Sequence, residues 1–316
     1  MSPQSPLPLL KYETKTLGNP SDPAVIVLVS TGMSGLNNAM IDRGLAQRGL
    51  YVILMNGRDT AGGSLEEAFD GDLPAGTDLM AEMNKAMAGE DFVAPYDWHD
   101  MADDVVNVLD QNEIAKAHVI GFSTAGTLAQ VVMTRHPDRL RSCVMCCSAY
   151  EFDFEPFAGE GADELVQVMQ SARPLKQGET TLQDWVQRQI DFFGLIRELE
   201  GQHDPRRAEM EECAADDFHN GWVDWTGMAN VRSALAFFMW RKKHEQRHKE
   251  ALRNNKVPAL VVHGEKDPVV AFNNAELLAE NTASASLKTH PYGHCLGPAR
   301  SENELLDFIV DFMKRH

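Results

Sequence analysis

The sequence predicts an α/β fold in which a mostly parallel, doubly wound sheet is interrupted by an inserted block of helices. Short apolar runs alternate with helical patterns as far as residue 150, which is the order expected of βαβ units. Residues 151–250 carry helical patterns only, and the alternation resumes afterwards. We therefore expect a core domain formed by residues 1–150 and 251–316, and a helical cap, or lid, formed by residues 151–250.

Composition restricts the class of protein. The 316 residues are 43% hydrophobic, which is enough for a packed core, and 29 Lys+Arg against 47 Asp+Glu give a net charge of −18. A chain this acidic is a poor partner for nucleic acid or for an anionic membrane surface. We therefore expect neither among its partners, while the oligomeric state stays open.

The cysteines and the start of the chain bear on its compartment. Of the five cysteines, Cys143, Cys146 and Cys147 crowd one apolar run. The odd number and this clustering favour buried core thiols over a disulfide framework, and over a redox or zinc role for the Cys-x-x-Cys spacing. The first residues lack an apolar leader, and no apolar run reaches the ~18 residues of a membrane span. We expect a cytoplasmic protein.

The strands are predicted from apolar, β-branched runs. A possible edge strand at residues 11–17 precedes a turn rich in Pro and Gly. Residues 24–29 are almost purely aliphatic, as in a parallel strand buried on both faces. Further strands are expected at residues 51–55, 118–122, 142–149, 259–262 and 286–290.

The helices are predicted where apolar residues recur at helical spacing. Residues 56–64 form a glycine-rich loop without the spacing of a phosphate-binding motif, so we interpret this loop as a turn. Residues 65–95 are an acidic insertion whose structure the pattern leaves open. Core helices are expected at residues 36–48, 98–112, 124–134, 273–281 and 302–315, and cap helices at 162–172, 182–200, 206–218 and 228–250.

Ser123 lies at the junction of a predicted strand and a predicted helix. A strand that turns at once into a helix holds its corner residue in a strained conformation, and small neighbours let the two segments pass. Gly121, Ala125 and Gly126 supply those neighbours, although Ala125 stands where the G-x-S-x-G motif has its second glycine. The sequence therefore predicts a nucleophile elbow with an exposed serine hydroxyl.

A serine nucleophile needs a base and a carboxylate that orients the base. Asp267 follows the strand at residues 259–262, and His294 follows the next strand along the chain. Because parallel strands end at the same edge of a sheet, both side chains can return to the edge where Ser123 is exposed. We predict a Ser123–His294–Asp267 triad, with Asp153 as an alternative acid.

The transition state of such a reaction requires donors for a developing oxyanion. The backbone N–H groups of Met33, in the loop after residues 24–29, and of Thr124, directly after the nucleophile, are the candidate pair. We expect no metal and no organic cofactor.

The chain resembles the α/β-hydrolases with a helical cap, across nearly its whole length apart from residues 65–95. Within that superfamily it is similar to the methylesterases that act on polyketide antibiotics such as aclacinomycin. Ser30-Thr31, Asn56 and Thr124-Ala125 depart from the usual pattern. The resemblance depends on Tyr51-Val52-Ile53, Arg58-Asp59-Thr60, Pro95-Tyr96, Ala102-Asp103-Asp104-Val105, Val108-Leu109-Asp110 and Ala117-His118-Val119-Ile120-Gly121.

We therefore expect a serine hydrolase that cleaves an ester of a hydrophobic carboxylic acid through an acyl-enzyme. One alternative keeps the site but breaks a C–C bond, or carries out a lyase or cyclase step on a polyketide-like substrate. A second alternative is a receptor that binds a ligand without turnover. Aromatic side chains gather in the predicted cap, where such clusters are more often helix-packing core than pocket lining. Some members of the group are expected to contact the substrate, and spacing does not show which: Phe192, Phe193, Trp222, Trp225, Phe237, Phe238 and Trp240.

Overall fold

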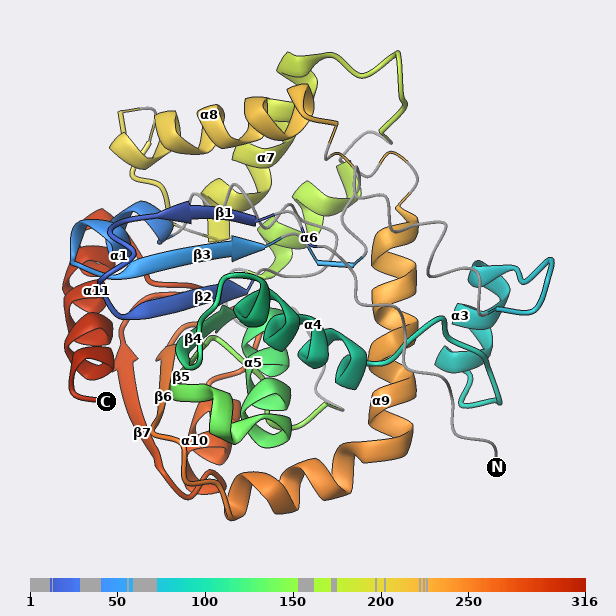
Figure 1. Ribbon diagram of the computed structural model, residues 1–316. Coiled ribbons are helices and arrows are strands. Elements are labelled where there is room, and N and C mark those ends of the chain that lie inside the picture. The colour runs from blue at the N-terminus through green and yellow to red at the C-terminus, as the bar shows by residue number, and fades with distance from the viewer. Residues whose placement is uncertain are drawn as a thin grey trace.

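A computed structural model shows seven strands in one sheet among the described residues, in the order β1-β3-β2-β4-β5-β6-β7 (Figure 1). The structure describes residues 12, 14–28, 41–55, 57–58, 73–152, 162–171, 175–196, 198–201, 203–221, 223, 225 and 227–316. All neighbouring strands are parallel except the edge strand β1, which pairs antiparallel with β3. The strands are β1 (Thr14–Leu17), β2 (Ala24–Leu28), β3 (Tyr51–Met55), β4 (Ala117–Phe122), β5 (Leu140–Cys146), β6 (Ala259–Gly264) and β7 (Ala285–His290).

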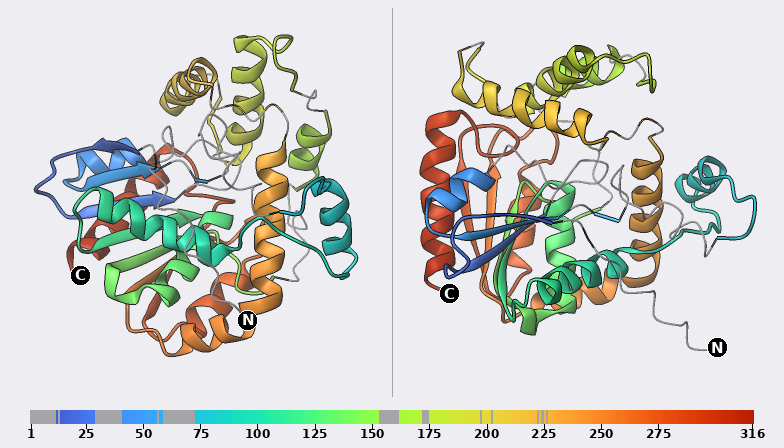
Figure 2. Two further views of the ribbon diagram at one scale, coloured as in Figure 1. Left: turned by 45° about the vertical axis from the view of Figure 1, so that its right-hand side comes forward. Right: turned by 45° about the horizontal axis from the view of Figure 1, so that its top comes forward.

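Helices cover both faces of this sheet, as the doubly wound prediction requires (Figure 2). One face packs against α1 (Asp42–Gln47) and α11 (Ala299–Lys314). The other packs against α4 (Trp98–Gln111), α5 (Thr124–Arg135), α10 (Asn273–Glu280) and part of α9 (Met228–Arg253). The predicted fold class is confirmed.

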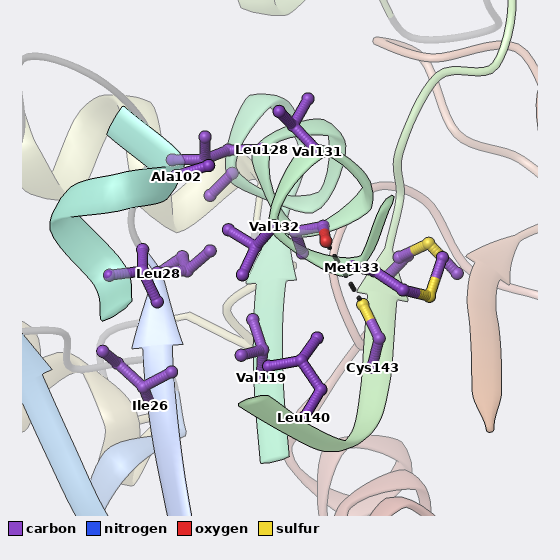
Figure 3. Close-up of a cluster of buried hydrophobic side chains, with 14 of the residues drawn as sticks. Ile26, Leu28, Ala102, Val119, Leu128, Val131, Val132, Met133, Leu140 and Cys143 are labelled. Atoms are coloured by element: carbon purple, nitrogen blue, oxygen red, sulfur yellow. Dashed lines mark hydrogen bonds between the residues drawn. The ribbon is translucent and has the colours of Figure 1, made fainter. Parts of the chain in front are cut away.

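The buried strand β4 and the helix after it form the centre of the core. Figure 3 shows side chains of α5, such as Val132, facing side chains of β2 and β4, such as Val119. Cys143 of β5 donates its S–H to the carbonyl oxygen of Ala129 at 3.6 Å (Figure 3). Burial of each large apolar side chain contributes roughly 1.5–3 kcal/mol, so this packing holds the strand–helix corner firmly. All five cysteines are free and buried, as expected.

Several predicted boundaries differ from the structure, and two of the differences have the same cause. Strand β5 ends at Cys146 rather than at residue 149, because Cys147 adopts a positive φ of 51° that no strand accommodates. Helix α7 (Leu182–Ile196) ends before residue 200, since Glu198 has a φ of 49°. Helix α11 begins at Ala299, directly after Pro298, rather than at residue 302.

The structure describes a helix in each of two further regions, the 65–95 insertion and the segment predicted as a helix at 36–48. The 65–95 insertion contains α3 (Leu79–Met87), which Asp78 caps through its side chain, and this helix packs against α9. The first part of the helix predicted at 36–48 lies outside the described residues, and α1 covers the rest.

Among the described residues between β5 and β6, the chain forms four helices: α6 (Ala162–Ser171), α7, α8 (Pro205–His219) and α9. In Figure 1, α7 and α8 lie apart from the sheet, whereas α9 runs down along α4 and α5. The division into a core domain and a cap at residues 151–250 stays a proposal. Among the described residues, no helix has both the length and the apolar character needed to cross a membrane.

A buried ion pair fixes the chain that follows β3. Arg58 donates from Nε to Asp104 Oδ2 at 2.6 Å and from Nη2 to Oδ1 at 2.5 Å, and both side chains are about 4% exposed or less. The guanidinium lies 4.8 Å from the centre of the Tyr96 ring. Arg58, Tyr96 and Asp104 belong to three of the segments on which the family resemblance depends. Their contact joins the chain after β3 to α4.

Replacing Asp104 by alanine is expected to lower the free energy of unfolding by about 3–5 kcal/mol, because Arg58 would stay buried without its carboxylate. Urea unfolding followed by circular dichroism would measure the change. The matched control is Asp110→Ala, which breaks the exposed Arg139–Asp110 pair on the same helix and should cost at most about 1 kcal/mol. Equal losses in the two variants would contradict the structural role of the buried pair.

Candidate active site

Ser123 occupies the corner between β4 and α5 in a conformation that a serine rarely adopts. Its φ is 54° and its ψ is −124°, and its side chain is partly exposed. The Ser123 N–H donates to the Cys146 carbonyl oxygen at 2.8 Å, so the neighbouring strand fixes the strained backbone. Strain of this kind costs on the order of 1–3 kcal/mol and persists where surrounding contacts over-determine it.

The small residues around Ser123 are required by the close approach of strand and helix. A Cβ atom added to Gly121 would lie 2.2 Å from the carbonyl oxygen of Ala125. One added to Gly126 would lie 2.8 Å from the Cβ of Ser148. Gly121 of the motif is therefore irreplaceable, and glycine is also required at position 126. Ala125, which departs from the motif, is buried in the core without disturbing the turn.

The register of the sheet brings the predicted site residues to one edge. Phe122 pairs with Cys146, Cys146 with Val262, and Gly264 with His290. The residues that follow these pairs therefore emerge side by side at the carboxyl ends of β4 to β7. Ser123, Asp267 and His294 all come from these four ends.

Asp267 and His294 are in direct contact. The Nδ1–H group of His294 donates to Asp267 Oδ2 at 2.7 Å, and both residues are 4% exposed. Since a carboxylate only accepts, this bond places the proton on Nδ1 and leaves Nε2 with a free lone pair. The arrangement gives a histidine that can accept a proton at Nε2.

The Asp267 carboxylate is fully hydrogen-bonded. Its Oδ1 accepts the N–H groups of Val269 at 2.8 Å and Val270 at 2.9 Å, while Oδ2 also lies 3.3 Å from Nε2 of His263. Burial alone would raise the pKa of Asp267, but its electrostatic interactions and hydrogen bonds with His294 and His263 hold it below its usual range. Asp267 is therefore ionised at neutral pH.

Other parts of the predicted site are not joined or are not described. No hydrogen bond links the Ser123 hydroxyl to His294 in the described part of the chain. Thr124 is the first residue of α5, so its N–H has no partner within the helix and can serve an oxyanion. Met33, the other predicted oxyanion donor, and Asp153, the alternative acid, lie outside the described residues. The triad and the oxyanion pair stay predictions.

Cys147 holds the backbone next to His294, a contact that sequence reasoning missed. Its Sγ accepts the N–H of Cys295 at 3.0 Å, and its S–H donates to the Cys295 carbonyl oxygen at 3.3 Å. Both cysteines have positive φ, at 51° and 70°. Burial first, and then the charge of Asp267, raises the pKa of the Cys147 thiol, so it stays protonated. The thiol therefore positions the loop and does not compete with Ser123 as a nucleophile.

Known proteins resemble this chain in sequence. The sequence model described as the alpha/beta hydrolase fold matches residues 72–297, more than half of the chain. The chain belongs to this family. The 2-hydroxymuconate semialdehyde hydrolase of Pseudomonas sp. (strain CF600) is 27% identical over 216 residues, which are 64% of this chain and 62% of that protein. The chain thus aligns with less than two thirds of that relative's length.

Solved structures share the fold of this α/β-hydrolase at low sequence identity. The enol-lactonase of Burkholderia xenovorans LB400 has a TM-score of 0.60 and 17% identity, covering 96% of each chain. The esterase of Exiguobacterium antarcticum has a TM-score of 0.59 and 19% identity, covering 96% of this chain and 95% of its own. At these identities the likeness establishes the fold alone.

Where α7 is followed by α8, Glu198, Asp204 and Arg206 form a corner that contacts the loop carrying His294. We call it the α7–α8 corner. Glu198 accepts the N–H of Gly293, the residue before His294. Arg206, which is 6% exposed, donates to the carbonyl oxygens of Glu198 at 3.2 Å and Gly297 at 2.9 Å. It is also paired with the Asp204 carboxylate at 2.7 Å. Residues far apart in the sequence therefore fix both ends of the loop, and no spacing pattern could have indicated this.

A cavity of about 310 Å³ opens beside His294, between α6, the end of α7 and the loops at the sheet edge. None of the described aromatic residues expected to contact substrate lines it, and Trp240 packs instead against Trp98 at 5.7 Å in the core. Trp222 lies outside the described residues. The lining is mainly aliphatic near the cap and polar near the loops: Glu164, Leu165, Leu195, Ile196, Glu198, Lys266, Pro268, Pro291, Tyr292, Gly293 and His294.

Proposed function

We propose that this α/β-hydrolase is a serine hydrolase that cleaves an ester of a hydrophobic carboxylic acid. The observation that carries the proposal is the bond between the His294 Nδ1–H and the Asp267 carboxylate, at the sheet edge where Ser123 holds a positive φ. A carboxylate-oriented imidazole beside a strained, partly exposed serine is the requirement for activating a hydroxyl nucleophile.

In the proposed reaction, Ser123 Oγ attacks the ester carbonyl while Nε2 of His294 takes its proton. The negative charge on the carbonyl oxygen is stabilised by the backbone N–H groups of Thr124 and Met33. His294 then returns the proton to the leaving alcohol, and an acyl-enzyme remains. Water attacks this intermediate with His294 again acting as the base, which restores Ser123.

The volume and the lining of the cavity favour a substrate with a small apolar acyl or ring system. Its volume of about 310 Å³ is at the lower end of ligand pockets. Leu165, Leu195 and Ile196 offer apolar contact, with Tyr292 nearer the loop. The polar side chains of Lys266 and Glu198 lie on the same lining and favour a substrate with one polar group beside its apolar part.

A second candidate is hydrolysis of a C–C bond. The curated relative at 27% identity is named for 2-hydroxymuconate semialdehyde, a carbon chain without an ester bond. The same serine, histidine and aspartate are compatible with either bond, because both reactions begin at a carbonyl carbon.

The test combines labelling with turnover. A fluorophosphonate probe is expected to label Ser123 and no other serine, which peptide mapping by mass spectrometry would show. Purified protein is then assayed against p-nitrophenyl esters of increasing acyl length and against 2-hydroxymuconate semialdehyde. Turnover of the esters supports the first candidate, and preference for the semialdehyde supports the second.

Three results would contradict the proposed serine hydrolase. Folded protein that the probe does not label has no activated serine at the elbow. Labelling at a different serine would place the chemistry elsewhere. Binding of esters without turnover would support the receptor alternative.

A further inference from the structure

A second group of ligating side chains meets outside the candidate active site, where the first turn of α4 packs against α9. Asp97 caps α4, His99 lies in its first turn, and His244 comes from α9. One ligand atom from each of the three lies within 4.8 Å of the others. Asp97 Oδ2 and His244 Nε2 are 3.7 Å apart. The cluster is assembled only by the fold, because α4 and α9 belong to distant parts of the chain.

The ring nitrogens of His99 and His244 and the Oδ2 atom of Asp97 are the atoms of this cluster that can bind an ion. The two imidazole rings stack with centroids 4.0 Å apart and an angle of 29° between their planes. Neither ring nitrogen of His99 or His244 forms a hydrogen bond within the described part of the chain. Asp97 Oδ1 accepts the His99 N–H at 2.8 Å, which orients the carboxylate and leaves Oδ2 pointing to His244. The contact of Oδ2 with Lys243 Nζ is long, at 3.5 Å, and that lysine is half-exposed.

The surrounding charges do not block a cation. Lys243, Arg135 and Arg247 face the histidines, but Asp103 binds the Arg135 guanidinium through two bonds of 2.6 and 2.7 Å. The carboxylates of Asp97 and Asp103 face the same space.

We propose that Asp97, His99 and His244 form a binding site for a divalent transition metal, with zinc the best match. Two neutral imidazoles and one carboxylate are a donor set that zinc accepts, and a water molecule completes a tetrahedral site at this partly exposed position. Ligand atoms around zinc lie about 3.3 Å apart, so the ligand atoms of this cluster, which lie within 4.8 Å of one another, must move closer, and the stacked rings must turn so that their nitrogens converge on the ion. The ion joins α4 to α9 next to the Trp98–Trp240 contact.

The test is zinc titration of the chelator-treated full-length protein by isothermal calorimetry. Binding of one ion per chain in the low micromolar range is expected, with a rise in Tm of several degrees at saturating zinc. His99→Ala and His244→Ala should each weaken binding by at least about 10-fold and abolish the Tm rise. The control His203→Ala removes an exposed histidine in the cap and should bind zinc as the natural protein does.

A competing position must be excluded. Ligand atoms of Cys147, Asp267 and His294 also lie within 4.8 Å of one another, and they are buried. A Cys147→Ala variant that keeps one-to-one binding and the Tm rise supports the Asp97 site. Binding that survives in the His99→Ala/His244→Ala double variant, or no binding by the natural protein at micromolar zinc, overturns the proposal.

Discussion

Replacing Ser123 by alanine is expected to lower kcat for the best ester by about 10⁶-fold, the scale on which loss of a serine nucleophile acts in serine proteases. The hydroxyl is the group that attacks the substrate, and no neighbouring side chain replaces it, since the buried Cys147 thiol stays protonated. Steady-state and burst-phase kinetics of the purified variant would measure the loss.

The Ser123→Ala variant should fold normally, because alanine keeps the same backbone and removes one partly exposed atom. An unchanged Tm would establish this. Ser171→Ala, at an exposed serine that donates to the Val168 carbonyl oxygen, is the matched control and should keep full activity. Activity of the Ser123 variant within about tenfold of the natural protein would rule out the nucleophile assignment.

Replacing Asp267 by asparagine is expected to lower kcat by about 10⁴-fold, as the equivalent change does in a serine protease. The asparagine oxygen can still accept the N–H groups of Val269 and Val270, so its NH₂ group must face His294. His294 would then accept at Nδ1 and carry its proton on Nε2. In that tautomer the imidazole cannot take the proton of Ser123.

Two further variants serve as comparisons for Asp267→Asn. Glu265→Gln changes an exposed carboxylate on the same loop, bonded to Thr289, and should leave kcat almost unchanged. Asp153→Asn tests the alternative acid and should have a mild effect. A large loss in the Asp153 variant together with a small loss in Asp267→Asn would identify Asp153 as the acid.

The order and type of elements could be predicted because apolar periodicity reports them directly. The strand at residues 24–28 and the helices beginning at Trp98 and Thr124 are local patterns, and the structure has them where the pattern indicates. The contact of Asp267 with His294 followed from a topological rule, since the ends of parallel strands share one edge. Both inferences need only neighbouring residues or the fold class.

What the sequence did not indicate depends on long-range contacts. The positive φ of Cys147 ends β5 early, and it is stabilised by Cys295 from the other end of the chain. Cap aromatics look like pocket residues by composition, yet Trp240 is completely buried against the core. His263 belongs to β6, and no local pattern indicates that its Nε2 lies 3.3 Å from Asp267. Side-chain direction at such positions is determined by tertiary packing.

The bond between Glu198 and the Gly293 N–H couples the position of the α7–α8 corner, which borders the cavity, to the order of the loop that carries His294. A ligand that holds the α7–α8 corner in place favours the ordered loop by the same factor by which the ordered loop favours that ligand. Displacing the corner would break the bond of Glu198 to the Gly293 N–H and the bond of Arg206 to the Gly297 carbonyl oxygen. We therefore expect a ligand that fills the cavity and contacts this corner to hold His294 in place as well.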